Sequence, residues 1–226
     1  MNIRVLTQLI LSLFFSIATC YALAAEPPAN TPAAGVVLAT AGTVEIQRGA
    51  QKITAERKTE LQVNDEIRTG DNARAQLRFA DGTVTTLGGN TGFVIKQFDW
   101  SAAKKEKSSA QFELLTGAFR SVTGKALDVA GSDFGVKTPA GVIGIRGTDF
   151  WGGYLDGDAV DVLLIDGKHA VEVSNTSGKV LLEIPGQGVT LKKDQSALTV
   201  KEWPQTKVGR AVATITWPDG STPPTE

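Results

Sequence analysis

The sequence predicts an all-β protein of many short strands joined by tight turns, arranged as a sandwich or as a solenoid. Branched side chains are abundant, with 20 Val, 12 Ile and 24 Thr against 19 Leu, and such side chains favour strands over helices. Apolar and polar residues alternate over Ala73–Phe79, as in a strand with one buried face. Turn signals recur roughly every 8–15 residues, a spacing typical of all-β folds.

The first half of the chain contains alternating segments separated by turn residues. We expect strands at Thr43–Gln47, Ala73–Phe79, Thr83–Leu87 and Phe93–Phe98. The pair Asp81-Gly82 is a strong signal for a hairpin between the second and third of these strands. The charged stretch at 100–111 is interpreted as a solvated hairpin tip rather than a basic contact loop.

The second half continues the pattern. Ala159–Ile165 is apolar on both alternating faces except at Asp161, which predicts a strand buried on both sides. Asp166-Gly167 then predicts a second hairpin, and a short helix is expected near Thr206–Ala213. The other strands are expected at Phe112–Ser121 with a bend at Gly117, Ser132–Thr138, His169–Ser174, Lys179–Ile184, Val189–Leu191 and Ser196–Val200.

Composition and charge exclude several classes of function. The formal net charge is −1, which argues against nucleic-acid binding because that needs clustered positive charge. A single Cys and a single His exclude an internal disulfide, a Cys-based zinc cluster and any site with two imidazoles. Most hydrolytic and metal-dependent machinery is therefore excluded or reduced to carboxylates. We expect no metal, no cofactor and no enzymatic activity.

The N-terminus has the pattern of a secretory signal peptide, which would form a helix. Arg4 is followed by an apolar stretch, and Ala22-Leu23-Ala24 matches a cleavage site. An uncleaved membrane anchor is the alternative. Cys20 lies in a near match to a lipoprotein box, and lipidation there would attach the protein to a membrane. Cleavage near Ala24 predicts a periplasmic or secreted protein.

The predicted division of the chain has four parts. A signal peptide at 1–24 precedes a flexible Pro/Ala-rich lead-in at 25–35. A β domain follows at 36–200, and a C-terminal extension and tail occupy 201–226.

Three motifs in the β domain go beyond a generic strand pattern. The run I-R-T-G-D-N-A-R-A-Q-L-R-F-A-D-G-T begins at Ile67, and F-E-L-L-T-G-A-F-R begins at Phe112. The third, T-P-A-G-V-I-G-I-R-G-T-D-F, spans Thr138–Phe150. In this order and at this separation they resemble the FecR domain, over about Val36–Gly188.

The resemblance implies an all-β periplasmic sensing domain. In classical members this domain belongs to a transmembrane anti-sigma regulator and receives a signal from an outer-membrane transporter. Here a signal peptide leads directly into the β domain, so the anti-sigma activity is not carried over. The resemblance therefore still implies a role in binding or in signal sensing in the bacterial envelope.

Five residues are candidates for a structural or partner-contacting role. Arg146 lies between two glycines in an apolar run. Its guanidinium is expected to form a bidentate pair with Asp149, Asp81 or Asp65. Arg74 is expected to line the same region or to face water. Phe150, Trp151 and Tyr154 form the densest aromatic cluster, which would be a partner or sugar platform if exposed and part of the core if buried.

The leading interpretation is therefore a non-enzymatic envelope protein that binds another protein through its sheet edges or through an aromatic loop near Trp151. A glycan- or peptidoglycan-binding module is the alternative. An unrecognised enzyme is the third possibility, because a site can be grafted onto any fold.

Overall fold

The computed structural model describes residues 33–100, 109–124, 133–145, 147–193 and 197–221. It contains two nine-stranded sheets and one helix, which confirms the predicted fold class. The predicted signal helix lies outside the described residues. Among the described residues, no helix is both long and apolar enough to cross a membrane.

Sheet 1 and sheet 2 are named here by their strands in spatial order. Sheet 1 consists of β18 (Lys201–Glu202), β17 (Gln187–Leu191), β14 (Val160–Gly167), β13 (Thr148–Tyr154), β10 (Ala118–Val122), β7 (Val84–Leu87), β6 (Arg74–Phe79), β1 (Gly35–Ala41) and β4 (Glu60–Leu61). Sheet 2 consists of β16 (Gly178–Leu182), β15 (Val171–Asn175), β12 (Gly141–Ile145), β11 (Asp133–Thr138), β9 (Ser109–Thr116), β8 (Gly92–Asp99), β5 (Glu66–Thr69), β2 (Val44–Arg48) and β3 (Gln51–Thr54).

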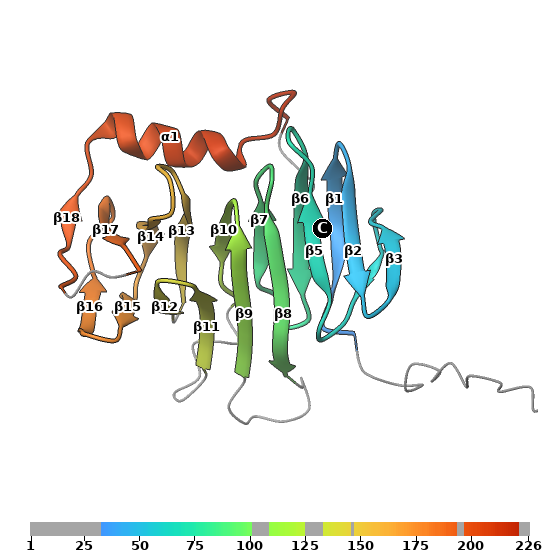
Figure 1. The fold of residues 1–226 in the computed structure, drawn as a ribbon, viewed down its shortest axis with the longest axis horizontal. Helices are drawn as coiled ribbons and strands as arrows, with labels where there is room; N and C mark the ends of the chain where they lie inside the picture. Colours follow the sequence, from blue (N-terminus) through green and yellow to red (C-terminus); the bar gives the residue numbers. More distant parts are fainter. Residues whose placement is uncertain (1–32, 101–108, 125–132, 146, 194–196, 222–226) are drawn as a thin grey trace, which may run out of the picture. The chain divides into compact units, whose positions relative to one another are not determined.

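The chain passes back and forth between the two sheets while it advances along them. Strands β6 and β7 lie in sheet 1, β8 and β9 in sheet 2, β10 in sheet 1, and β11 and β12 in sheet 2. Figure 1 shows the colours running in chain order along both sheets, from blue to red. The fold is therefore a sandwich in its layers and resembles a solenoid in the way the chain advances.

A single apolar core lies between the two sheets. Its centre is a chain of phenylalanine rings whose neighbouring centroids are 4.8–5.7 Å apart. These rings come from β6, β8, β9, β10, β11 and β13, at Phe79, Phe93, Phe98, Phe112, Phe119, Phe134 and Phe150. Because alternate residues of a strand point to opposite faces, one or two phenylalanines from each strand can reach the core and pack between the sheets.

Helix α1 (Gln205–Ile215) covers part of the outer face of sheet 1, close to the predicted helix. Figure 1 shows it lying across the ends of β13 and β10. Ala211 and Ile215 of α1 pack with Trp151 and Leu163 in a second apolar cluster. This cover explains why β14 is buried on both faces, as its sequence predicts.

The turn predictions had mixed outcomes. Asp81-Gly82 does connect the paired strands β6 and β7, and Gly82 has a φ of +86°. The predicted hairpin at Asp166-Gly167 is wrong, because β14 belongs to sheet 1 and the following β15 to sheet 2. There the chain crosses the core instead of folding back on its own strand.

Two strand predictions also need correction. The single strand expected at Phe112–Ser121 is two strands, β9 and β10, and the chain changes sheets between them at Gly117. Residues 197–200 carry no strand, and β18 begins only at Lys201. Leu198 and Val200 nevertheless pack against the main core, which accounts for the alternating pattern of that segment.

Candidate binding groove

Arg146 lies outside the described residues, but its three expected partners do not. Asp65 accepts two hydrogen bonds from Arg48, each 2.8 Å. Asp149 accepts two from Arg120, at 2.8 and 2.6 Å. The side chain of Asp81 accepts from the backbone N–H and hydroxyl of Thr83, both at 2.9 Å.

Phe150 and Trp151 lie in strand β13 and not in a loop, and both side chains are fully buried. Phe150 points into the main core. Trp151 points to the other face, where its indole N–H donates to the hydroxyl of Thr214 on α1 at 2.9 Å. Of the two possibilities left open by the sequence, the structure shows the buried one.

Arg74 fastens the end of α1 to sheet 1. Its Nε donates to the carbonyl of Thr216 at 2.9 Å, and its Nη1 donates to the carbonyl of Ala73 at 2.8 Å. Burial lowers the pKa of the Arg74 guanidinium. The side chain of Arg74 is half-buried. Whether it lines the same region as Arg146 stays a prediction, because Arg146 lies outside the described residues.

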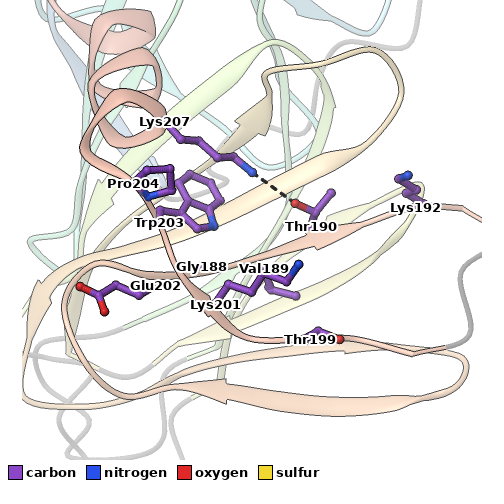
Figure 2. A pocket seen from close by; sticks show the side chains of 10 residues that line it. All are labelled: Gly188, Val189, Thr190, Lys192, Thr199, Lys201, Glu202, Trp203, Pro204 and Lys207. Atoms are coloured by element: carbon purple, nitrogen blue, oxygen red, sulfur yellow. Dashed lines mark hydrogen bonds between the residues drawn. The ribbon is translucent and has the colours of Figure 1, made fainter.

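A cavity of about 400 Å³ lies where the chain enters α1 (Figure 2). Lys207 reaches across it, with its ammonium 2.7 Å from Oδ1 of Asp161 and 3.3 Å from the hydroxyl of Thr190. The same ammonium lies 3.9 Å from the ring centroid of Trp203. Asp161, which is buried, also accepts a hydrogen bond from Thr190.

The contacts of Lys207 indicate a structural role for this cavity. Its ammonium is engaged by a carboxylate, a hydroxyl and an indole face, each a favourable partner for a cation. The pair with Asp161 joins α1 to β14 and so fixes the position of the helix. Lys192, Lys201 and Glu202 are exposed around the opening.

A larger cavity, of about 680 Å³, contains Tyr154 and is called here the Tyr154 groove. It lies where loops of both sheets gather at one end of the sandwich, a usual place for binding sites. Its lining comes from the last residues of β9 and β13 and from the segments that follow β7, β9, β11, β13 and β17, at Gly89, Asn90, Leu115, Thr116, Gly117, Pro139, Ala140, Tyr154, Gly157, Asp158 and Lys193.

The floor of the Tyr154 groove is held by a dense set of hydrogen bonds. The carbonyl of Gly117 accepts from the backbone N–H of Tyr154 at 3.0 Å. The hydroxyl of Thr116 donates to the carbonyl of Asn90 at 3.0 Å, and that of Thr91 contacts the backbone of Ala118 at 3.1 Å. The groove is thus largely formed before any ligand binds.

The centre of the groove is apolar and its rim is charged. Leu115 is 37% exposed, and Ala140 and Tyr154 are half-buried beside it. Asp158 and Lys193 are exposed at the rim. Desolvation, with a smaller contribution from the charge of Asp158, raises the pKa of the Tyr154 phenol. At neutral pH that hydroxyl is therefore a hydrogen-bond donor.

A second cavity, of about 370 Å³, continues the groove. It shares Asn90, Leu115 and Thr116 with the Tyr154 groove, and it ends at the ion pair between Arg68 and Glu66. Within the described ranges, no group of three or more His, Cys, Asp or Glu residues could hold a metal.

The Tyr154 groove has an apolar centre and a rim with charges of both signs, which is the usual composition of a protein-binding surface.

The sequence model of the family described as "FecR protein" matches residues 65–169. The chain contains a FecR domain. This match confirms the resemblance carried by the three motifs, and it includes every lining residue of the Tyr154 groove except Lys193. No curated protein matches the sequence.

Solved structures share much of this fold. Two crystal structures of a "putative anti-sigma factor" from Parabacteroides distasonis ATCC 8503, at 1.65 and 2.50 Å resolution, each match with a TM-score of 0.50 and 19% identity. The match covers 64% of this chain and 62% of that protein. At this identity the likeness concerns the fold.

Of the five residues singled out from the sequence, Tyr154 alone lines the groove of the FecR domain, since Arg146 lies outside the described residues. Sequence reasoning missed Leu115, the exposed apolar residue at its centre. A signal was present, because Leu114 and Leu115 are adjacent in an alternating strand and so must face opposite sides. Leu114 enters the core, which leaves Leu115 outside.

Proposed function

We propose that this chain is a non-enzymatic regulatory module of the bacterial cell envelope, and that it binds a segment of a protein partner in the Tyr154 groove. The observation that carries the proposal is the position of the groove within the FecR domain, at residues 65–169. The structural neighbour described as an anti-sigma factor supports a signalling role.

The chemistry of the groove favours a short peptide with one apolar side chain as its ligand. Leu115, Ala140 and Tyr154 offer apolar contact area, and the Tyr154 hydroxyl offers a hydrogen-bond donor to a backbone carbonyl. Loops fixed by hydrogen bonds lower the ordering cost of binding. The glycan alternative has less support, since three of the four tryptophans, Trp151, Trp203 and Trp217, are buried, and only Trp100 is partly exposed.

The experiment is site-specific photocrosslinking in cells. A photoreactive residue replaces Leu115, and a matched control carries it at Val212 on α1, because these two side chains are 37% and 38% exposed. We expect one protein adduct at position 115, none at position 212, and loss of the adduct when Tyr154→Ala is added. Thermal unfolding of the Tyr154→Ala variant checks that it is folded.

The outcomes separate the alternatives. Equal adducts at both positions, or an adduct that survives Tyr154→Ala, would contradict binding in the groove. Sedimentation of the purified protein with isolated peptidoglycan, without a protein adduct, would replace the proposal with the glycan-binding alternative.

We also propose that the protein is periplasmic or secreted after cleavage near Ala24, with a β domain at 36–200 and a C-terminal extension. The support is the signal-peptide pattern of the N-terminus. The N-terminus of the protein purified from cell fractions tests this. A chain that begins at a modified Cys20 would show lipidation instead, and one that retains Met1 would show an uncleaved anchor.

A further inference from the structure

The four edges of the two sheets are not equally protected against pairing with another strand. An exposed edge strand presents unpaired backbone groups, and proteins commonly shorten such strands or place charges on them. Strands β4 and β18, the edges of sheet 1, have two residues each. Strand β3, one edge of sheet 2, has four residues and carries Lys52, paired with Glu45 at 2.8 Å.

The remaining edge is β16, which has five residues and pairs only with β15 among the described strands. Leu181 on this strand is 46% exposed, and Ile184 just beyond it is 62% exposed. An edge of this length with exposed apolar side chains is a site where another strand adds to the sheet.

The order of side chains along β16 is complementary to itself. Val180 and Leu182 face the core, so Lys179 and Leu181 face outward. Glu183 directly follows the strand, and a partner strand that extends the pairing by one residue would bring it to the side of Lys179 and Leu181. In an antiparallel pair of two copies centred on Leu181, each Leu181 meets the other. Lys179 of each copy then lies opposite Glu183 of the other, and Val180 lies opposite Leu182.

Both charged residues are available for this pairing. Glu183 is exposed directly after the end of β16, and its backbone N–H donates to Oε1 of Gln187 at 2.8 Å. The Lys179 ammonium lies 3.0 Å from Glu172 on β15, with a side chain that is 66% exposed. It can bridge Glu172 and a second carboxylate, because an ammonium has three donors.

From this self-complementarity we infer that a second copy of the chain pairs with the β16 edge, joining two copies of sheet 2 across a two-fold axis. A closed symmetric pair buries the same edge on both copies and leaves no further open edge at that place. The contact is small, so the dimer is weak and depends on protein concentration. This inference does not rest on the partner proposed for the Tyr154 groove.

Charge reversal tests the register of this pairing by sedimentation equilibrium. Lys179→Glu places Glu opposite Glu183, and Glu183→Lys places Lys opposite Lys179, so each variant alone should dimerise at least about tenfold more weakly than the wild type. In a mixture of the two variants every opposed pair has opposite charges. We therefore expect the mixture to form a heterodimer, which a mass tag on one variant identifies.

The matched control is Lys52→Glu, which also breaks an exposed cross-strand pair on an edge strand of sheet 2 but should leave dimerisation unchanged. A wild-type protein that stays monomeric up to about 1 mM, the weak end of the range of dissociation constants for specific pairs, would overturn the inference. Variants that dimerise like the wild type, or a mixture that stays monomeric, would overturn it as well.

Discussion

The carboxylate of Asp65 is fully buried, and Arg48 donates one hydrogen bond to each of its two oxygens. The backbone N–H of Gln62 donates to Oδ2 as well, at 2.8 Å. The guanidinium also reaches the carbonyl of Glu60 at 2.9 Å. This bidentate ion pair connects β2 of sheet 2 to the segment that joins β4 to β5. It also covers the adjacent end of the core.

We predict that Arg48→Ala lowers the free energy of unfolding by about 3 kcal/mol, because it leaves a buried carboxylate without its cation. Arg120→Ala should cost only about 1 kcal/mol, since the side chains of Arg120 and Asp149 are 39% and 16% exposed. Urea unfolding of both variants measures the difference. Equal losses would show that burial of Asp65 does not set the strength of its ion pair.

Gly117 is the basis of a second prediction. Its φ is +78°, and a Cβ there would lie 2.3 Å from Oγ1 and 2.5 Å from Cα of Thr91. Gly117→Ala should therefore cost about 3 kcal/mol or more, combining the left-handed backbone with a steric clash. Gly157→Ala is the control, because Gly157 has a φ of +65° but no atom within 4 Å of its Cβ position.

The control variant should lose only about 1 kcal/mol, measured in the same urea titration. If Gly117→Ala and Gly157→Ala lower the free energy of unfolding by the same amount, the close approach of Thr91 to residue 117 does not add to the cost of the substitution.

Local patterns in the sequence predicted many of the strands but not their partners, and they missed others, such as β1, β12 and β13. The hairpin at Asp81-Gly82 depends on neighbouring residues, and it was confirmed. The turn at Asp166-Gly167 has the same two residue types but leads to the other sheet, because β14 is already paired on both sides, with β13 and β17. Residue types at a turn do not determine which strand is free to pair.

The candidate site shows the same limit. Trp151 was expected near an aromatic loop, and the docking of α1, more than fifty residues later in the chain, covers its side chain. The Tyr154 groove combines strand ends and turns from five places that are distant in sequence, so no single segment indicates it. Tyr154 was singled out because it belongs to an aromatic cluster, two members of which turned out to be buried.

The contact between Trp151 and Thr214 leads to a third prediction. Thr214→Val preserves the shape of the side chain but removes the acceptor of a buried indole N–H. We expect a loss of about 1–2 kcal/mol in the free energy of unfolding, with a change in tryptophan fluorescence. Thr216→Val removes an exposed hydroxyl that bonds only to the carbonyl of Val212, and it should change stability by less than about 0.5 kcal/mol.

A fourth prediction concerns pH and Asp81. Burial raises the pKa of this carboxyl, although hydrogen bonds from Thr83 oppose the shift. The folded protein then binds the proton more tightly than the unfolded chain. The contribution of Asp81 to stability is therefore greatest below the unfolded pKa of about 4 and is lost as pH rises from there through the folded pKa.

The variant Asp81→Asn isolates this effect. Its amide oxygen can still accept the backbone N–H of Thr83, but the side chain does not ionise. We expect the stability of the wild type relative to Asp81→Asn to fall as pH rises from about 4 and then to level off, as measured by urea unfolding of both proteins at each pH. A relative stability that rises with pH would mean that the hydrogen bonds from Thr83 outweigh the cost of burying the charge.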